Sequence, residues 1–338
     1  MTTDVLSDVL RAVHLTGAVF FDFDLTAPWV LAAPPSRDIA QRVMPGAHHV
    51  IEYHLVIAGG GWARVADGRA FAIAAGDLVV VPRGDAHVLS SAPDLHEAPD
   101  LSAFDPPLAP LPLLRRVGGG ERARVVCAFL GCDERPYNPM LDALPRVMHV
   151  RSAHPHAADD WLATLVASAA QESGRARDGR ANVLARLSEL LFVEAIRRYL
   201  ETLPADQTGW LAGLRDGVVG HALAALHAHV ADPWTVERLA RHVGVSRSVL
   251  AQRFTNFVGR SPMQYLALWR MQLAARMLGE GARVGQVAEA IGYASEPAFS
   301  RAFKKVVGRP PKAFRSAGPT YREGVSTVFR NRFQELAS

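Results

Sequence analysis

The sequence predicts a multi-domain protein in which an N-terminal all-β barrel precedes a C-terminal all-α domain with two helix–turn–helix units. The length of 338 residues is too great for one ordinary hydrophobic core, so two or more domains are expected. Short apolar runs between Gly, Pro and Asp clusters fill roughly the first 150 residues, which is typical of antiparallel strands. The last third of the chain instead shows helical periodicity, and its pattern occurs twice.

The N-terminal domain is predicted to begin with a short helix over residues 4–14, whose apolar side chains share one face. The chain then changes to strand-like runs at 19–25, 50–57, 62–65, 70–74 and 77–81. Between Gly76 and His87, a tight turn precedes an apolar strand, and a second turn contains Pro82 and Gly84. His87 then stands at the entry of the next strand. We therefore expect an antiparallel barrel or sandwich.

The segment Gly76–His87 resembles the second conserved motif of the cupin β-barrel, G-x5-P-x-G-x2-H, and matches it at every fixed position. His54, followed by three glycines, is similar to a remnant of the first cupin motif. The resemblance implies a cupin-like sensor fold, and enzymatic cupins generally hold a metal ion with three His and a Glu. His54 and His87 fit that ligand set and Glu52 shares the strand parity of His54, but no third His falls into place.

Two interpretations of these histidines are left open. In the first, His54 and His87 line an effector pocket for a small molecule. In the second, Cys127 and Cys132 join them in a tetrahedral zinc-type or redox-responsive site. Against the second, Cys127 lies in an apolar run, where buried thiols are commonly inert. The odd spacing also places the cysteines on opposite faces of a regular strand unless the chain turns at Gly131. No cofactor is certain, and zinc or another transition metal is the alternative.

The C-terminal repeat extends from Trp234 to Arg315. The residues that recur in kind 48 or 49 places later are Val236, Leu239, Ala240, Val243, Gly244, Leu250, Phe254, Gly259 and Pro262. Each copy predicts a short helix, a glycine turn and a serine-capped second helix, at about 235–257 and 284–307. A connecting helix of about 17 residues spans roughly 26 Å, which holds two reading helices near the 34 Å repeat of B-DNA.

This repeat resembles the DNA-binding domain of the AraC/XylS family of bacterial transcription regulators. The runs that carry the resemblance are Ala288–Tyr293, Phe299–Lys305 and Gly308–Arg315. The family commonly joins such a domain to an N-terminal cupin-like sensor. The resemblance implies a sequence-specific transcriptional regulator, more often an activator, that binds double-stranded promoter DNA as a homodimer, contacts RNA polymerase and responds to a small-molecule, metal or redox effector.

The resemblance also implies which residues meet DNA. The base-facing positions are Ser248, Ala251, Gln252, Glu296, Ser300 and Arg301. Arg301 can form a fork onto guanine and Gln252 onto adenine, each worth about 1 to 3 kcal/mol of discrimination. Phosphate contacts, which add affinity and salt dependence but little specificity, are Arg247, Arg253, Lys304, Lys305 and Arg309. Since the second reading helix carries Arg301 and the lysine pair, we expect it to contribute more than the first.

Between these parts, helices are predicted at residues 161–171 and 181–203. The second has a broad apolar stripe, which either packs against the barrel or, as the family resemblance favours, forms a dimer interface. The expected division is a sensor domain at 1–152, a helical dimerisation segment and linker at 153–209, a DNA-binding domain at 210–320 and a tail at 321–338.

Charge and composition agree with this division. Residues 210–338 carry 18 Lys and Arg against 8 Asp and Glu, whereas residues 1–209 carry 19 against 25. A polyanion is therefore expected to meet the C-terminal part only. Two cysteines make no disulfide framework, the N-terminus does not resemble a signal peptide, and no apolar run approaches the roughly 18 to 20 residues that cross a bilayer. We expect a cytoplasmic protein without enzymatic activity. The alternative, a cupin-type metalloenzyme fused to a DNA-binding module, needs a complete metal ligand set.

Overall fold

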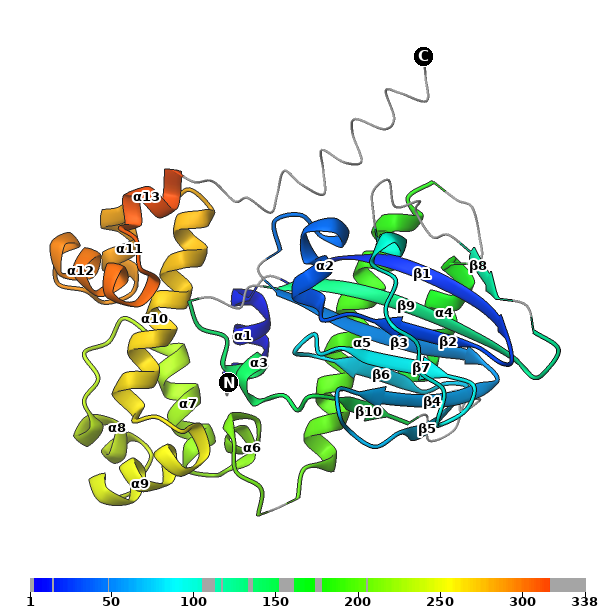
Figure 1. Ribbon diagram of the computed structural model, residues 1–338. Helices are drawn as coiled ribbons and strands as arrows, with labels where there is room; N and C mark the ends of the chain where they lie inside the picture. The colour runs from blue at the N-terminus through cyan, green and yellow to red at the C-terminus, as the bar shows by residue number, and fades with distance from the viewer. Residues whose placement is uncertain are drawn as a thin grey trace. The chain divides into compact units, whose positions relative to one another are not determined.

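The computed structural model describes residues 3–13, 15–47, 49–104, 113–116, 118–132, 136–151, 161–173, 178–204 and 206–316. These residues form two compact units, each built from separate stretches of the chain (Figure 1). Among the described residues, the β unit contains those of 15–132 and 144–202, and the helical unit contains those before 15, those of 133–143 and those of 203–316. The predicted tail at 321–338 lies outside the described residues.

Two sheets form the core of the β unit, as the sequence predicts. The six-stranded sheet has the order β10 (Met148–Val150), β6 (Leu78–Val81), β3 (His49–Ala58), β9 (Arg122–Cys132), β1 (Thr16–Thr26) and β8 (Leu113–Arg116). The four-stranded sheet has the order β2 (Val30–Ala33), β7 (His87–Ser90), β4 (Gly60–Val65) and β5 (Phe71–Ala74). Among the described pairs only β1 and β8 run parallel.

Strands β3 and β9 lie at the centre of the larger sheet and are buried along most of their length. Helices α4 (Trp161–Ser173) and α5 (Arg180–Thr202) pack together, with α4 against β3 and α5 against β1, β9 and β10. Both helices begin and end within about two residues of their predicted limits. Two shorter helices, α2 (Ser36–Val43) and η1 (Leu101–Phe104), also belong to this unit and are not foreseen from the sequence.

The helical unit contains both predicted helix–turn–helix motifs. Its C-terminal helices are α6 (Trp210–Arg215), α7 (Val219–Ala228), α8 (Val236–His242), α9 (Arg247–Val258), α10 (Pro262–Gly279), α11 (Val284–Ala290), α12 (Glu296–Val307) and α13 (Pro311–Ser316). Ser246, Ser261 and Ser295 accept backbone N–H groups as N-caps of α9, α10 and α12. Gly244 and Gly292 make the two motif turns with positive φ, as their positions in the repeat predict.

Two short helices from the first half of the chain also belong to the helical unit. They are α1 (Val5–Ala12) and α3 (Pro139–Ala143). The apolar face of α1 is buried at Val5 and Val9, and α1 packs against α3, α7 and α10. The sequence predicts a contiguous domain over residues 1–152, whereas the fold groups these two segments with the C-terminal helices. In the part of the chain that the structure describes, no helix has the length and hydropathy of a membrane span.

Candidate nucleic-acid interface and candidate metal centre

The helices α9 and α12 present matching faces. In α9, Leu250 and Phe254 are completely buried, and Phe299 and Phe303 are completely buried at the corresponding places in α12. Gln252 and Arg301 each stand two residues before the second anchor, about 200° around the helix from it. Both side chains are exposed. The fold therefore brings the two predicted residues with the strongest base-reading chemistry to equivalent, accessible positions.

The other predicted base-facing residues differ in exposure. Ser248 and Glu296 are exposed, whereas Ala251 and Ser300 are half-buried. Glu296 is the first residue of α12, where the helix dipole favours a carboxylate. Helix stability therefore explains the place of Glu296 without any contact to a cytosine amino group.

Val249 is an exposed residue of the first reading helix that the sequence argument misses. It keeps 46% of its surface exposed beside the buried Leu250. An apolar side chain at this position can contact the methyl group of a thymine. Helical spacing could have predicted the exposure of Val249, because Leu250 and Phe254 define the core face of α9 and Val249 lies outside that face.

The predicted phosphate-binding cations fall into two groups. Arg247 pairs with Glu237 at 3.0 Å, and the Arg309 guanidinium lies 4.4 Å from the centre of the Phe314 ring. Lys304 and Lys305 are exposed and form no ion pair with any residue that the structure describes. The lysine pair on α12 is therefore the more accessible positive charge for a phosphate backbone.

Arg253, another predicted phosphate contact, has a structural partner. Its guanidinium donates to both carboxylate oxygens of Asp216, with the shortest distance 2.6 Å. The same carboxylate accepts the backbone N–H groups of Val218 and Val219 at the start of α7. Arg253 thus ties α9 to α7, and this ion pair competes with any contact that it makes to phosphate.

A second candidate site lies inside the β unit, where His54, His87 and Glu52 meet. Glu52 and His54 share one face of β3, and His87 opens β7 in the other sheet. The Nε2 atoms of the two histidines are 2.6 Å apart, and a Glu52 carboxylate oxygen lies 3.8 Å from His87 Nε2. Among the described residues, these three form the one group of His, Cys, Asp or Glu with ligand atoms close enough to share a metal ion.

Hydrogen bonds determine which ring nitrogen carries the proton in each of the two histidines. His87 Nδ1 donates to the Asp85 carbonyl oxygen at 2.9 Å, which leaves His87 Nε2 with a free lone pair. His54 Nε2–H donates to that lone pair, and His54 Nδ1 then accepts the Cys127 thiol proton across 2.7 Å. Burial lowers the pKa of His54 and lowers the pKa of His87 to about 4, so both rings are neutral near pH 7.

Glu52 is the member of this group that has no hydrogen-bond partner among the described residues. Its side chain is completely buried, and neither carboxylate oxygen makes a hydrogen bond. Burial raises the pKa of Glu52 well above its ordinary value. A buried carboxyl group without a partner is costly, and a bound cation would compensate that cost.

These residues fit a transition-metal ion. One carboxylate and two imidazole nitrogens are a common ligand set for zinc and similar ions. If the His54 proton moves from Nε2 to Nδ1, both Nε2 lone pairs become available and Nδ1–H is directed at Cys127. The Asp85 carbonyl already fixes the His87 tautomer that a metal ligand requires.

The two cysteines predicted for this site are separated. Cys127 pairs with His54 across β3 and β9, whereas Cys132 pairs with His49, five residues further along a continuous strand. The odd spacing puts them on opposite faces, and five residues span roughly 16 Å. Cys132 is therefore excluded from the site, and the two thiols are too far apart for a disulfide. Burial raises the pKa of Cys127 well above its ordinary value, which suppresses the reactive thiolate.

Two protein-family models match the chain. A model described as "Cupin" matches residues 4–201, and one described as "Helix-turn-helix domain" matches residues 239–317. An AraC-like transcription regulator of Streptomyces lividans is 39% identical over 204 residues, which are 60% of this chain and 66% of that protein. The chain thus spans about two thirds of the length of this relative.

Two further relatives match over most of their lengths. The HTH-type transcriptional regulator AlkR of Acinetobacter baylyi is 28% identical over 92% of this chain and 99% of its own. The RCS-specific HTH-type transcriptional activator RclR of Escherichia coli is 26% identical over 80% of this chain and 86% of its own. All three relatives are named as regulators of transcription, which points away from an enzyme.

The cupin match covers more than half of the chain, and the repeated reading helices follow it in the order that the sequence predicts. The chain thus combines a β unit that contains a buried site with a helical unit whose two motifs expose the side chains predicted to read bases. The chain belongs to the AraC/XylS family of transcriptional regulators that carry an N-terminal cupin domain.

Proposed function

We propose that this regulator reads two different half-motifs of promoter DNA, with the second reading helix contributing more than the first. The exposed pair Gln252 and Arg301, at equivalent positions of α9 and α12, is the observation that supports this proposal. Arginine prefers guanine and glutamine prefers adenine, so two copies of one motif would not satisfy both helices. The exposed Lys304 and Lys305, which form no ion pair with a described residue, give α12 the greater attraction to phosphate.

The test is a binding series on an operator selected by the full chain from random DNA. Arg301→Ala should lower discrimination at one guanine by about 1 to 3 kcal/mol, because a bidentate contact to that base is lost. Lys305→Ala should weaken binding to all sequences alike and reduce the salt dependence by about one counterion. Fluorescence anisotropy over a range of salt concentrations measures both effects.

The matched comparison is Gln252→Ala, which should relax one base pair in the other half-motif at a smaller cost in affinity. Identical effects of Arg301→Ala and Lys305→Ala on every operator variant would contradict the assigned roles. A larger loss from Gln252→Ala than from Arg301→Ala would contradict the order of the two readers.

We further propose that the β unit senses a divalent transition-metal ion held by Glu52, His54 and His87. The completely buried carboxyl of Glu52, which makes no hydrogen bond to any part of the chain that the structure describes, favours this ligand over a neutral small molecule. The bound ion would hold Glu52 and His54 of one sheet against His87 of the other sheet. The names of the relatives favour a signalling role for such an ion over catalysis.

This metal proposal is tested by dialysis of the full chain against a chelator and titration with Zn²⁺. Unaltered protein should bind one zinc ion, as measured by elemental analysis, and Glu52→Gln should weaken binding by at least about tenfold. Cys132→Ser is the matched control and should bind zinc normally, since Cys132 lies on the other face of β9. Absence of stoichiometric zinc, iron or copper in unaltered protein would rule the metal out.

We also propose that the chain acts as a homodimer through α5 and activates transcription by contact with RNA polymerase. Val183 and Leu190 on α5 are 46% and 44% exposed, and Trp161 on the adjacent α4 is 50% exposed. Val183 and Leu190 are seven residues apart and so lie on one face of α5, and exposed apolar side chains on one helix face favour burial against a second copy. A reporter promoter that responds to the selected operator tests the sign of regulation.

A further inference from the structure

Gln272 is a buried polar residue in the middle of α10, the helix that connects the two motifs. Only 1% of its surface is exposed. Its Oε1 atom accepts the Tyr137 backbone N–H at 3.0 Å, and its Nε2 atom donates to the Ala12 carbonyl oxygen at 3.2 Å. One side chain of α10 therefore holds the backbone of two segments that come from the first half of the chain.

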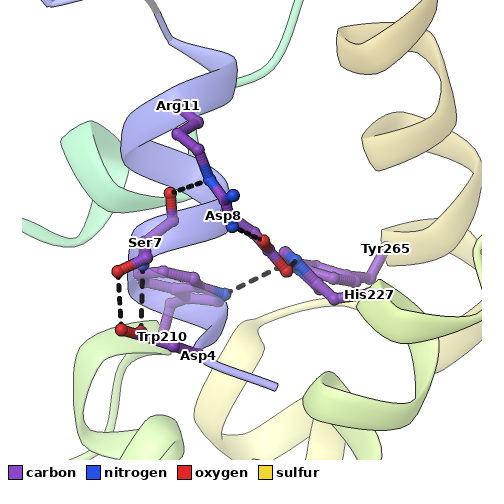
Figure 2. A network of polar contacts seen from close by, with 7 residues as sticks. All are labelled: Asp4, Ser7, Asp8, Arg11, Trp210, His227 and Tyr265. Atoms are coloured by element: carbon purple, nitrogen blue, oxygen red, sulfur yellow. Dashed lines mark hydrogen bonds and ion pairs between the residues drawn. The ribbon is translucent and has the colours of Figure 1, made fainter.

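A second polar network attaches α1 to the same region (Figure 2). Asp8 lies 3.6 Å from Nδ1 of the buried His227 on α7, and His227 Nε2 lies 2.8 Å from the Tyr265 hydroxyl on α10. Trp210 of α6 donates its indole N–H to that hydroxyl at 3.1 Å. Asp8 is thus the partly exposed α1 end of a chain of polar groups that crosses three other helices.

Both attached segments continue directly into central strands of the β unit. The chain runs from α1 into β1, and it runs from β9 into the segment that contains Tyr137 and α3. Thr16 of β1 and Gly131 of β9 are register partners, so the two connections start from the same end of adjacent strands. β9 also carries Cys127, the hydrogen-bond partner of His54.

The ring contacts of the attached segments lead toward the first motif, although Gln272 itself is flanked on α10 by Met271 and Ala274 of the second motif's core. The Arg260 guanidinium, just after α9, lies 5.7 Å from the centre of the Tyr137 ring, whose edge contacts Tyr265. The core of the second motif is built from residues of α10 to α13 and includes no residue of α1 or α3 among those described. A displacement of the two segments would therefore reach α9 before α12.

We propose that Gln272 is a positioning residue through which the β unit sets the orientation of the first reading helix, while the second reading helix is independent of it. This inference rests on the proposed reading of two unequal half-motifs. The amide suits this role because it satisfies one donor and one acceptor of separate segments at once. An aliphatic side chain at position 272 would leave both backbone groups buried without a partner.

Gln272→Met in the full chain tests the proposal, because methionine has a similar length and makes neither hydrogen bond. Affinity is measured for the selected operator and for two variants, one altered at the base pair read by Gln252 and one at the base pair read by Arg301. Discrimination at the Gln252 base pair should fall by about fivefold or more, the lower end of what one base contact supplies. Discrimination at the Arg301 base pair should not change.

Asp8→Asn provides an independent variant in case Gln272→Met does not fold. It removes the charge next to His227 and should reduce discrimination at the first half-motif only. Asp4→Asn is its matched control on the same helix, since asparagine caps a helix as well as aspartate does, and it should change neither half-motif.

Equal losses at both base pairs in Gln272→Met and Asp8→Asn, or no loss at the first, would overturn the positioning role and leave the two-reader proposal intact. Unaltered protein that fails to discriminate at the Gln252 base pair would overturn the two-reader proposal and this inference with it.

Discussion

His227 has a completely buried side chain whose environment fixes its charge. Burial lowers its pKa below the ordinary 6.5, although the nearby Asp8 acts in the opposite direction. The ring stacks on Trp269 with centres 4.3 Å apart, and its Nε2 atom faces the Tyr265 hydroxyl. His227 is therefore neutral in the folded protein near pH 7, with Nδ1–H directed at Asp8 and Nε2 accepting from Tyr265.

This neutral state predicts a loss of stability on mild acidification. The unfolded chain binds a proton at position 227 as the pH falls through about 6.5, whereas the folded protein resists that proton, so the free energy of unfolding decreases as the pH falls below this value. The slope is at most about 1.4 kcal/mol per pH unit for one group. Guanidinium unfolding at pH 7.5 and 5.5 measures the decrease.

The control is His227→Gln, which does not titrate and should lose less stability between the two pH values. The other groups that face this position keep their charge state in this range. The neighbouring His227 lowers the pKa of Asp8 below its ordinary 3.8, and burial raises the pKa of Tyr265. Equal pH dependence in both proteins would contradict the prediction.

At the scale of single residues, the sequence predicts what depends on local spacing. The exposure of Gln252 and Arg301 follows from helical periodicity, and the odd spacing of Cys127 and Cys132 already argues against a shared site. The unpartnered state of Glu52 is different, because it depends on which strands pair and on what lies opposite in the other sheet. Non-local packing of that kind has no signature in the order of residues.

The two motif turns show how equivalent elements differ in their surroundings. Gly244 and Gly292 both have positive φ, at 75° and 78°. A Cβ atom at position 244 would meet open space, whereas one at position 292 would collide with the Ala231 carbonyl oxygen. The first turn therefore needs glycine for its backbone conformation only, and the second needs it for close backbone approach as well.

Alanine at these positions should consequently have unequal effects. Gly244→Ala should destabilise the helical unit by about 1 to 2 kcal/mol, the cost of a left-handed conformation for a residue with a Cβ atom. Gly292→Ala should cost more, because the Ala231 backbone must also shift. Chemical denaturation of the two variants beside unaltered protein gives the difference, and equal losses would contradict the collision at position 292.

Elements are predicted well where their signals are local. The serine caps and turn glycines of the repeat lie within a few residues of the helices that they limit, and those helices match the prediction closely. The amphipathic spacing of α1 likewise predicts a helix, but it does not say which core accepts that face. The burial of α1 against α7 and α10 depends on contacts between residues more than 200 positions apart, such as Ala12 and Gln272.

At the scale of the whole molecule, the two units differ in charge and are connected by the path of the chain. The excess of basic residues lies in the C-terminal part, which attracts DNA, and the acidic excess lies in the part that contains the β unit. The path of the chain links them in several places, because α1 leads into the β unit and the segment with α3 leaves that unit and re-enters it.

The proposed self-association through α5 is a property of the whole molecule that one substitution can test. Leu190→Glu places a charge in the exposed apolar surface of α5 and should convert the dimer to a monomer at micromolar concentration, as measured by analytical ultracentrifugation. Val249→Glu is the matched control, because Val249 is exposed to a similar extent but lies on α9, so this variant should remain dimeric.

The same Leu190→Glu variant separates affinity from specificity. A monomer loses the gain that comes from linking two DNA-binding units, so its affinity for a two-site operator should fall by about a hundredfold or more. Its discrimination at the base pairs read by Gln252 and Arg301 should persist, because the side chains and their supporting core belong to one helical unit. A sedimenting monomer in unaltered protein would contradict the dimer, whereas loss of discrimination in Leu190→Glu would show that α5 also shapes the reading helices.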